Sequence, residues 1–217
     1  MVLLIVLSAC SVKEKKSFEK LGGTLVTIQL AEDHSAYKEV LSNRLNYFSE
    51  LYRMNYSRLE TDNQLKISFP IFLSDNQLKN LLLAKGEFSI TVEDSVYFND
   101  DVVEKVFLDY GGLGVSGKPF VNVDLKPAYH EEFENFSIRY LEQIIAVNVD
   151  TFVVMSPRIA DTIVTGDISI IVVDSKELNS YVAASVLKIP FHLTPAAEVV
   201  NKQLYYFSSD KQLVEIS

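Results

Sequence analysis

The segment that decides the fold begins with GGTLVTIQL at residues 22–30. After the glycine pair, apolar and polar residues largely alternate, and this period of two predicts a half-buried strand. Residues 35–53 then carry apolar side chains mostly at spacings of three and four. That spacing places them on one face of a helix. A strand followed by a helix therefore opens the folded part of the chain.

The same pattern continues to residue 92. Residues 58–71 predict two strands joined by a turn at Asp62-Asn63, whose short side chains favour such turns. Residues 74–77, SDNQ, form a capping box that begins a helix. Residues 88–92 alternate as a further strand. The order strand, helix, strand, strand, helix, strand predicts a ferredoxin-like unit.

The rest of the chain predicts a second set of strands and helices. Residues 129–144 carry an aromatic stripe at helical spacing, which we interpret as core. Pro190 favours an edge position for the strand predicted around it. The remaining expectations are a short helix at 100–106, strands at 120–125, 145–149, 152–155, 168–173 and 188–193, a helix from Ser175, and a weakly helical tail after residue 194.

Composition excludes several classes of protein. The 217 residues carry a net charge of −9, which argues against binding to nucleic acid phosphates. The single cysteine excludes a disulfide framework and a zinc site built from several cysteines. A hydrophobic fraction of 48% is that of a folded chain and too high for a disordered one.

No constellation of residues predicts catalysis. His34, His130 and His192 lie far apart in different predicted elements, and no hydrolase or metalloprotease motif surrounds them. The carboxylates of Asp100 and Asp101 lack the glycine and spacing of a calcium loop. Residues 111–114, GGLG, lack the Lys-Ser/Thr of a phosphate loop. We therefore predict no catalytic residue, no metal ligand and no cofactor; a hydrolase whose site assembles from distant residues remains an alternative.

The cysteine itself lies in an informative place. An apolar run at residues 2–9 is too short to span a bilayer and ends in Leu7-Ser8-Ala9-Cys10. This sequence resembles the bacterial lipoprotein box, which implies lipidation of Cys10 and membrane attachment through that lipid. Residues 1–20 would then be a signal and a polar tether. A buried strand with a buried cysteine is the alternative.

Several segments, in order, resemble the first periplasmic domain of SecD, a bacterial membrane protein that assists protein export. They are Leu21-Gly22-Gly23, LKISFP at 65–70, the helix–glycine–strand at 82–90 with Gly86, GKPFVNV at 117–123, VVMSPRI at 153–159 followed by Gly166, and residues 182–193. No single motif is specific, and their order over most of the chain carries the resemblance.

The resemblance implies an α+β protein with antiparallel or mixed sheets: a ferredoxin-like base with an inserted α+β head lobe. The base lobe would comprise residues 21–94, the head lobe 95–173, a closing helix and strand of the base 174–195, and a C-terminal tail 196–217. Insertion at a loop between close strand ends is structurally inexpensive. Gly22, Gly23, Gly86 and Gly166 are expected at structural turns.

These features predict a non-catalytic envelope lipoprotein that binds polypeptide or assists protein export, with Ser156, Pro157 and Arg158 as the partner-binding turn. Without an apolar run that could supply SecD's membrane helices, we expect no proton-driven motor. Ser11 favours the outer membrane, with the folded part on the periplasmic side. The alternative is an envelope assembly or scaffold lipoprotein that keeps the fold without the export role, since a fold does not determine its function.

Overall fold

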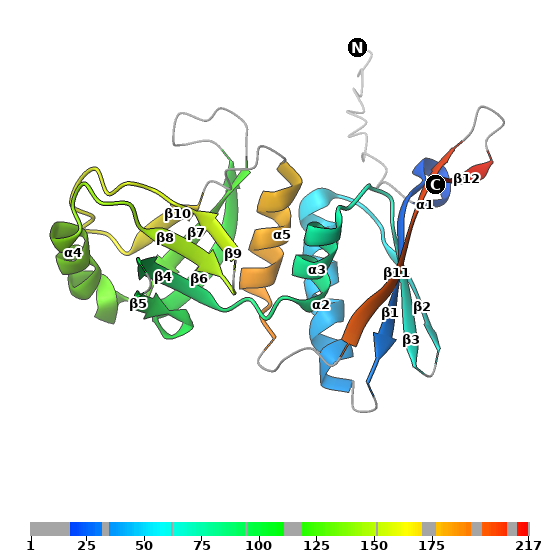
Figure 1. Cartoon of the computed structure of the whole chain (residues 1–217), viewed down its shortest axis with the longest axis horizontal. Helices are drawn as coiled ribbons and strands as arrows, with labels where there is room; N and C mark the ends of the chain where they lie inside the picture. Colours follow the sequence, from blue (N-terminus) through cyan, green and yellow to red (C-terminus); the bar gives the residue numbers. More distant parts are fainter. Residues whose placement is uncertain are drawn as a thin grey trace, which may run out of the picture.

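The structure, a computed structural model, describes residues 18–31, 35–61, 63–93, 95–110, 119–150, 152–170, 177–191, 197–207 and 212–216. In this part of the chain the strands form three sheets, and every strand pair is antiparallel. One sheet and its helices form a base, and the other two form a head (Figure 1). The expected α+β class with antiparallel sheets is confirmed.

The base sheet has the strand order of a ferredoxin-like fold, extended by one short strand. The order is β12 (Leu213–Ile216), β11 (Ala197–Phe207), β1 (Gly23–Leu30), β3 (Gln64–Phe69) and β2 (Ser57–Thr61). Helices α2 (Ser35–Tyr52) and α3 (Asp75–Leu83) lie on one face of this sheet, and the short α1 (Phe18–Leu21) lies beside β11 (Figure 1). The two middle strands, β1 and β3, are buried on the face toward the helices.

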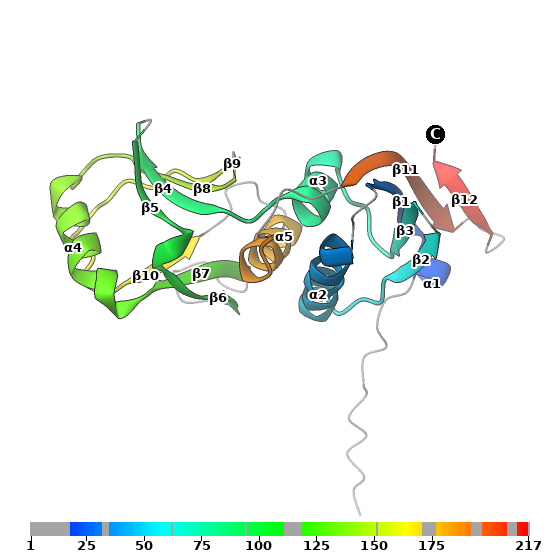
Figure 2. The same cartoon turned by 90° about the horizontal axis from the view of Figure 1, so that it is seen from below.

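The head contains two smaller sheets. One has the order β5 (Ser95–Asn99), β4 (Phe88–Val92), β8 (Ala146–Val149) and β9 (Phe152–Met155), and the other β10 (Asp167–Ile170), β7 (Pro119–Leu125) and β6 (Val103–Tyr110). Short 3₁₀ turns at Asp100–Val102 and Pro127–Tyr129 precede β6 and α4 (His130–Arg139). Figure 2 shows the two sheets as separate layers, with α4 at the end of the head far from the base.

Helix α5 (Glu177–Lys188) lies between base and head. It contacts α2 and α3 on one side and β6 and β7 on the other. None of residues 178–187 is exposed, although Ser180, Ser185 and two alanines lie among them. A helix that is buried on all sides is typical of an element packed between two layers. Both views show this position of α5 (Figures 1 and 2).

Four strand and helix predictions are wrong. Residues 88–92 form β4, which pairs with β5 and β8 in the head and not with the base. The base sheet is closed instead by β11, within residues 196–217 that were expected as a weakly helical tail; β11 pairs with β1 along its length. Residues 189–191, expected within a strand, follow α5 without strand structure, and residues 103–106, expected as helix, begin β6. Non-local pairing overrides local propensity in β4, β6 and β11.

Arg44 is the largest fully buried polar side chain in the described structure, and it binds the ends of two helices. Its Nε donates to the Ile189 carbonyl after α5 at 2.8 Å, and its Nη1 donates to the Ala84 carbonyl after α3 at 2.7 Å. Its guanidinium carbon lies 4.1 Å from the centroid of the Phe191 ring. Burial lowers the Arg44 pKa to about 10, so the side chain stays charged at neutral pH. A cation is favourable there because helix C-termini carry partial negative charge.

We predict that Arg44→Met destabilises the protein by about 3–5 kcal/mol, because buried carbonyls at the ends of α3 and α5 lose their donor. Urea unfolding followed by circular dichroism measures the change. Arg58→Ala is the matched control: Arg58 forms an exposed ion pair with Glu60, and such pairs contribute at most about 1 kcal/mol. Equal midpoints for Arg44→Met and the unmodified chain would contradict this role of Arg44.

Candidate functional site

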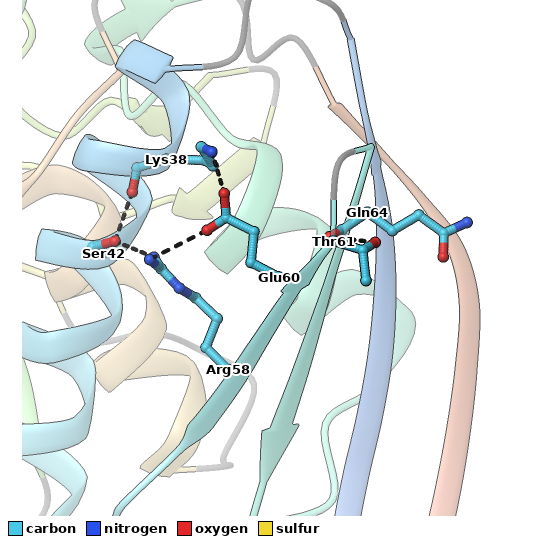
Figure 3. A network of polar contacts seen from close by, with 6 residues as sticks. All are labelled: Lys38, Ser42, Arg58, Glu60, Thr61 and Gln64. Carbon is cyan, nitrogen blue, oxygen red and sulfur yellow. Dashed lines mark hydrogen bonds and ion pairs between the residues drawn. The ribbon is translucent and has the colours of Figure 1, made fainter.

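Two edge strands, β2 in the base and β9 in the head, differ in how they are protected from pairing with another chain. At the base, β2 is fully exposed, yet charged side chains link it to α2 (Figure 3). Lys38 of α2 forms an ion pair with Glu60, and Arg58 lies 3.6 Å from the same carboxylate. Arg58 also donates to Ser42 of α2. Charges on an edge strand oppose pairing with another chain, so this edge is unsuited to binding an extended peptide.

The head presents an edge of a different kind at β9. This strand pairs with β8 alone, and the pairing continues irregularly past its end. The Ile145 N–H donates to the Pro157 carbonyl, and the Ile159 N–H donates to the Gln143 carbonyl, both at 3.0 Å. Since backbone groups alternate in direction along an antiparallel ladder, those of Arg158, between the two, point away from the sheet. The segment after β9 therefore offers a backbone edge.

A groove of about 440 Å³ lies beside this edge, between the two head sheets. Its floor is apolar core, and its outer wall is the irregular segment that connects β9 to β10. The apolar lining residues are Ile90, Phe133, Ile145, Val147, Met155, Ile159, Ile163, Val164 and Ile168. Val164 is 64% exposed, so an apolar side chain reaches solvent at the mouth of the groove. This volume is within the usual range for a ligand-binding cleft, about 300–1,000 Å³.

The structure brings two of the three predicted contact residues to this groove. Pro157 and Arg158 belong to its wall, and Ser156 directly precedes them. Arg158 lies 3.4 Å from Glu142, with both side chains largely exposed. Such a pair is weak, so the guanidinium can change partners at little cost. Sequence analysis missed Asp161, Val164 and Asp167, because they lie on or next to a segment without regular periodicity.

The glycines expected at turns occupy constrained positions. Gly22, Gly23 and Gly86 have φ of 72°, 138° and 89°, in the region that favours glycine. A Cβ on Gly86 would lie 2.5 Å from the Val186 carbonyl oxygen of α5. Gly166 lies against the ring of His130, whose Nε2 is 3.0 Å from the Leu125 carbonyl oxygen. Through this contact the His130 ring, at the start of α4, packs against the groove wall.

A second cleft, of about 430 Å³, lies where the chain passes from base to head. Two head carboxylates bind the backbone of this linker. Asp150 accepts the N–H groups of Gly86 and Glu87, each at 2.9 Å, and Asp100 accepts that of Phe88 at 2.5 Å. Desolvation, opposed by the Phe88 hydrogen bond and assisted by nearby carboxylates, raises the pKa of Asp100. Both carboxylates therefore serve to fix the linker backbone.

Other predicted features fall outside these two clefts. His34, His192 and Cys10 lie outside the described residues, so the structure places none of them. Among the residues that are described, no three His, Cys, Asp or Glu side chains gather as a metal site. No helix in the same residues has the length and apolar character needed to cross a membrane. The head groove is thus the strongest candidate site.

Comparison with solved structures identifies the fold. A crystal structure of SecDF in a super-membrane-facing form is similar over 92% of this chain and 32% of that chain, with 12% identity and a TM-score of 0.52. A second structure, of a membrane component SecDF that enhances protein export, is similar over 82% of this chain and 98% of that chain, with 15% identity and a TM-score of 0.49. SecDF from Thermus thermophilus, a translocon-associated membrane protein, covers 86% and 31% at 14% identity and TM-score 0.39.

The chain thus spans about a third of the SecDF protein it matches best in fold among these three. No protein-family model matches the chain. No curated protein matches it either. At this level of identity the comparison shows a SecD-like fold and no more. Function has to be argued from the residues of the groove.

The raised pKa of Asp100 predicts a pH effect on stability. The native state binds its proton more tightly than the unfolded chain, so this group's contribution falls as pH rises through the native pKa. Asp100→Asn keeps an acceptor for the Phe88 N–H and removes the titration. We expect the variant to be at least as stable as the unmodified chain at pH 7 and to lose that advantage near pH 3, as measured by thermal unfolding. A variant that is less stable at pH 7 would contradict the prediction.

Proposed function

We propose that this protein binds extended, apolar polypeptide segments in the head groove and assists protein export, as a non-catalytic member of the cell envelope. The observation that carries the proposal is the apolar groove beside the outward-facing backbone groups of Arg158. SecDF is a membrane component that enhances protein export, and the shared fold makes the same process the natural setting for this chain. In this proposal base and head are separate lobes, and the head lobe binds the polypeptide.

The two features of the site are complementary. An extended chain can add to the edge through main-chain hydrogen bonds at Ser156–Arg158, which requires no particular sequence. Side chains that alternate along the bound strand then point toward the groove, whose floor at Val147 and Ile168 is apolar. Main-chain bonding provides general affinity, and the groove favours apolar side chains. That combination suits a protein that meets many unfolded sequences and no single folded partner.

The same proposal places the protein at the periplasmic face of the envelope, held by a lipid on Cys10. The lipoprotein-like sequence before Cys10 supports this, together with the polar residues that follow it and connect to the base. Attachment through several acyl chains is stable, whereas one chain binds a membrane only marginally. The base would then stand near the membrane and the head would extend from it.

We predict that Cys10→Ser abolishes incorporation of a clickable palmitate analogue and moves the protein from the membrane fraction to the soluble fraction. Because Cys10 is the single cysteine, no other thiol in the chain can carry the label. Lys13→Ala, three residues away, is the control and should label normally. Unchanged membrane association in Cys10→Ser would overturn lipid anchoring and leave the groove proposal intact.

We predict that Val164→Asp weakens peptide binding about tenfold, because the new carboxylate must be desolvated in an apolar contact. Fluorescence anisotropy with a labelled unstructured peptide of about twelve residues, Leu and Val between Gly and Ser, measures the change. Val96→Asp is the matched control: Val96 is 62% exposed on β5, at the opposite edge of the same head sheet.

Equal weakening by both valine variants would locate binding elsewhere in the head. No binding by the unmodified chain would reject the proposed function. Tight, stoichiometric capture of one folded envelope protein, with no affinity for unfolded peptides, would favour the scaffold role instead.

A further inference from the structure

The charges around the head groove are unevenly distributed. Its outer wall, residues 160–167, carries two exposed carboxylates, Asp161 and Asp167, and no basic residue. The one basic side chain in the groove lining, Arg158, lies before this wall and already faces Glu142. The wall that borders the apolar floor therefore carries negative charge and no basic residue.

Asp167 has a further neighbour of the same sign. In the ladder between β10 and β7 it lies directly opposite Asp124. Like charges in directly opposed positions destabilise a sheet, so this pair costs free energy in the unbound protein. The pKa of Asp124 is raised, by desolvation first and by Asp167 second, against the opposing effect of Lys105.

Lys105, the basic neighbour of Asp124, does not form an ion pair with it. Lys105 lies opposite Asp124 on β6, yet its Nζ is 4.4 Å from the centroid of the Phe107 ring. Across the described residues, no Lys, Arg or His nitrogen is within 4.0 Å of a carboxylate oxygen of Asp124, Asp161 or Asp167. The Asp161 carboxylate accepts the adjacent Thr162 N–H at 2.7 Å. A bound cationic group would relieve the repulsion.

We propose that the groove selects apolar segments that are flanked by lysine or arginine, with the basic side chain beside Asp161 and Asp167. This inference rests on the proposed function and adds a preference to it. Apolar side chains fill the floor, and the basic side chain neutralises the wall. Both requirements can be met by one extended segment, because consecutive side chains of a strand point to opposite sides. Apolar segments flanked by acidic residues are disfavoured by the same charges.

Three fluorescent peptides with one apolar centre test this preference on the full chain. They carry two flanking lysines, two serines or two glutamates. At about 20 mM salt we expect the lysine peptide to bind about three- to tenfold more tightly than the serine peptide, and the glutamate peptide to bind most weakly. The difference should shrink at about 300 mM salt, because exposed charges are then screened.

The double variant Asp161→Asn/Asp167→Asn isolates the wall. It should equalise the affinities for the lysine and serine peptides. The control Glu198→Gln/Glu215→Gln makes the same change in net charge on exposed base positions, and it should keep the preference.

The outcomes separate the two proposals. If no peptide binds, the proposed function fails, and the inference fails with it. If all three bind equally, the preference alone is overturned. If the lysine preference persists in Asp161→Asn/Asp167→Asn, or falls equally in that variant and in the base control, it does not arise from the wall and the inference is overturned.

Discussion

The burial of one guanidinium is the constraint on which the arrangement of base and head depends. Arg44 has no exposed surface, so its charge has to be compensated inside the protein. The carbonyls that bind it come from the ends of α3 and α5, where the chain leaves for the head and where it returns. Phe191 covers the guanidinium and donates its N–H to the Lys85 carbonyl at 2.6 Å. The two chain segments that connect base and head therefore bind the same side chain. This fixes the position from which the inserted lobe starts.

From this point the head is fixed by contacts that sequence periodicity does not show. Asp150 and Asp100 bind three successive amides of the linker, and α5 packs against the outside of β6 and β7. The N–H groups of residues 86–88 that bind these carboxylates cannot form hydrogen bonds with the base sheet at the same time. This explains why β4 turns away from the base, although its alternating residues would suit either sheet. The strand that pairs with β1 in the base sheet is instead β11, more than a hundred residues later.

Local patterns were sufficient for the elements whose partners are near in sequence. The capping box was predicted from Ser74 and Gln77 alone, and both of its hydrogen bonds are present. β6 was missed because a bulge between Val103 and Lys105 interrupts its alternation. β11 was missed because it is only partly buried and its pairing with β1 is long-range. For the site, resemblance to SecD led to Pro157 and Arg158, whereas Asp161 and Asp167 depend on how an irregular wall folds over the groove.

The contrast between two sheet edges gives the clearest indication of function. An unprotected edge promotes aggregation, and β2 shows how this chain suppresses it, with ion pairs that reach over from α2. The edge after β9 has no comparable cover in the described structure. Beside it lie an exposed valine and a groove that opens to the apolar core. The edge after β9 lies open next to an apolar cleft, whereas ion pairs protect the edge at β2. Binding of extended polypeptide fits both the backbone of the open edge and the lining of the cleft.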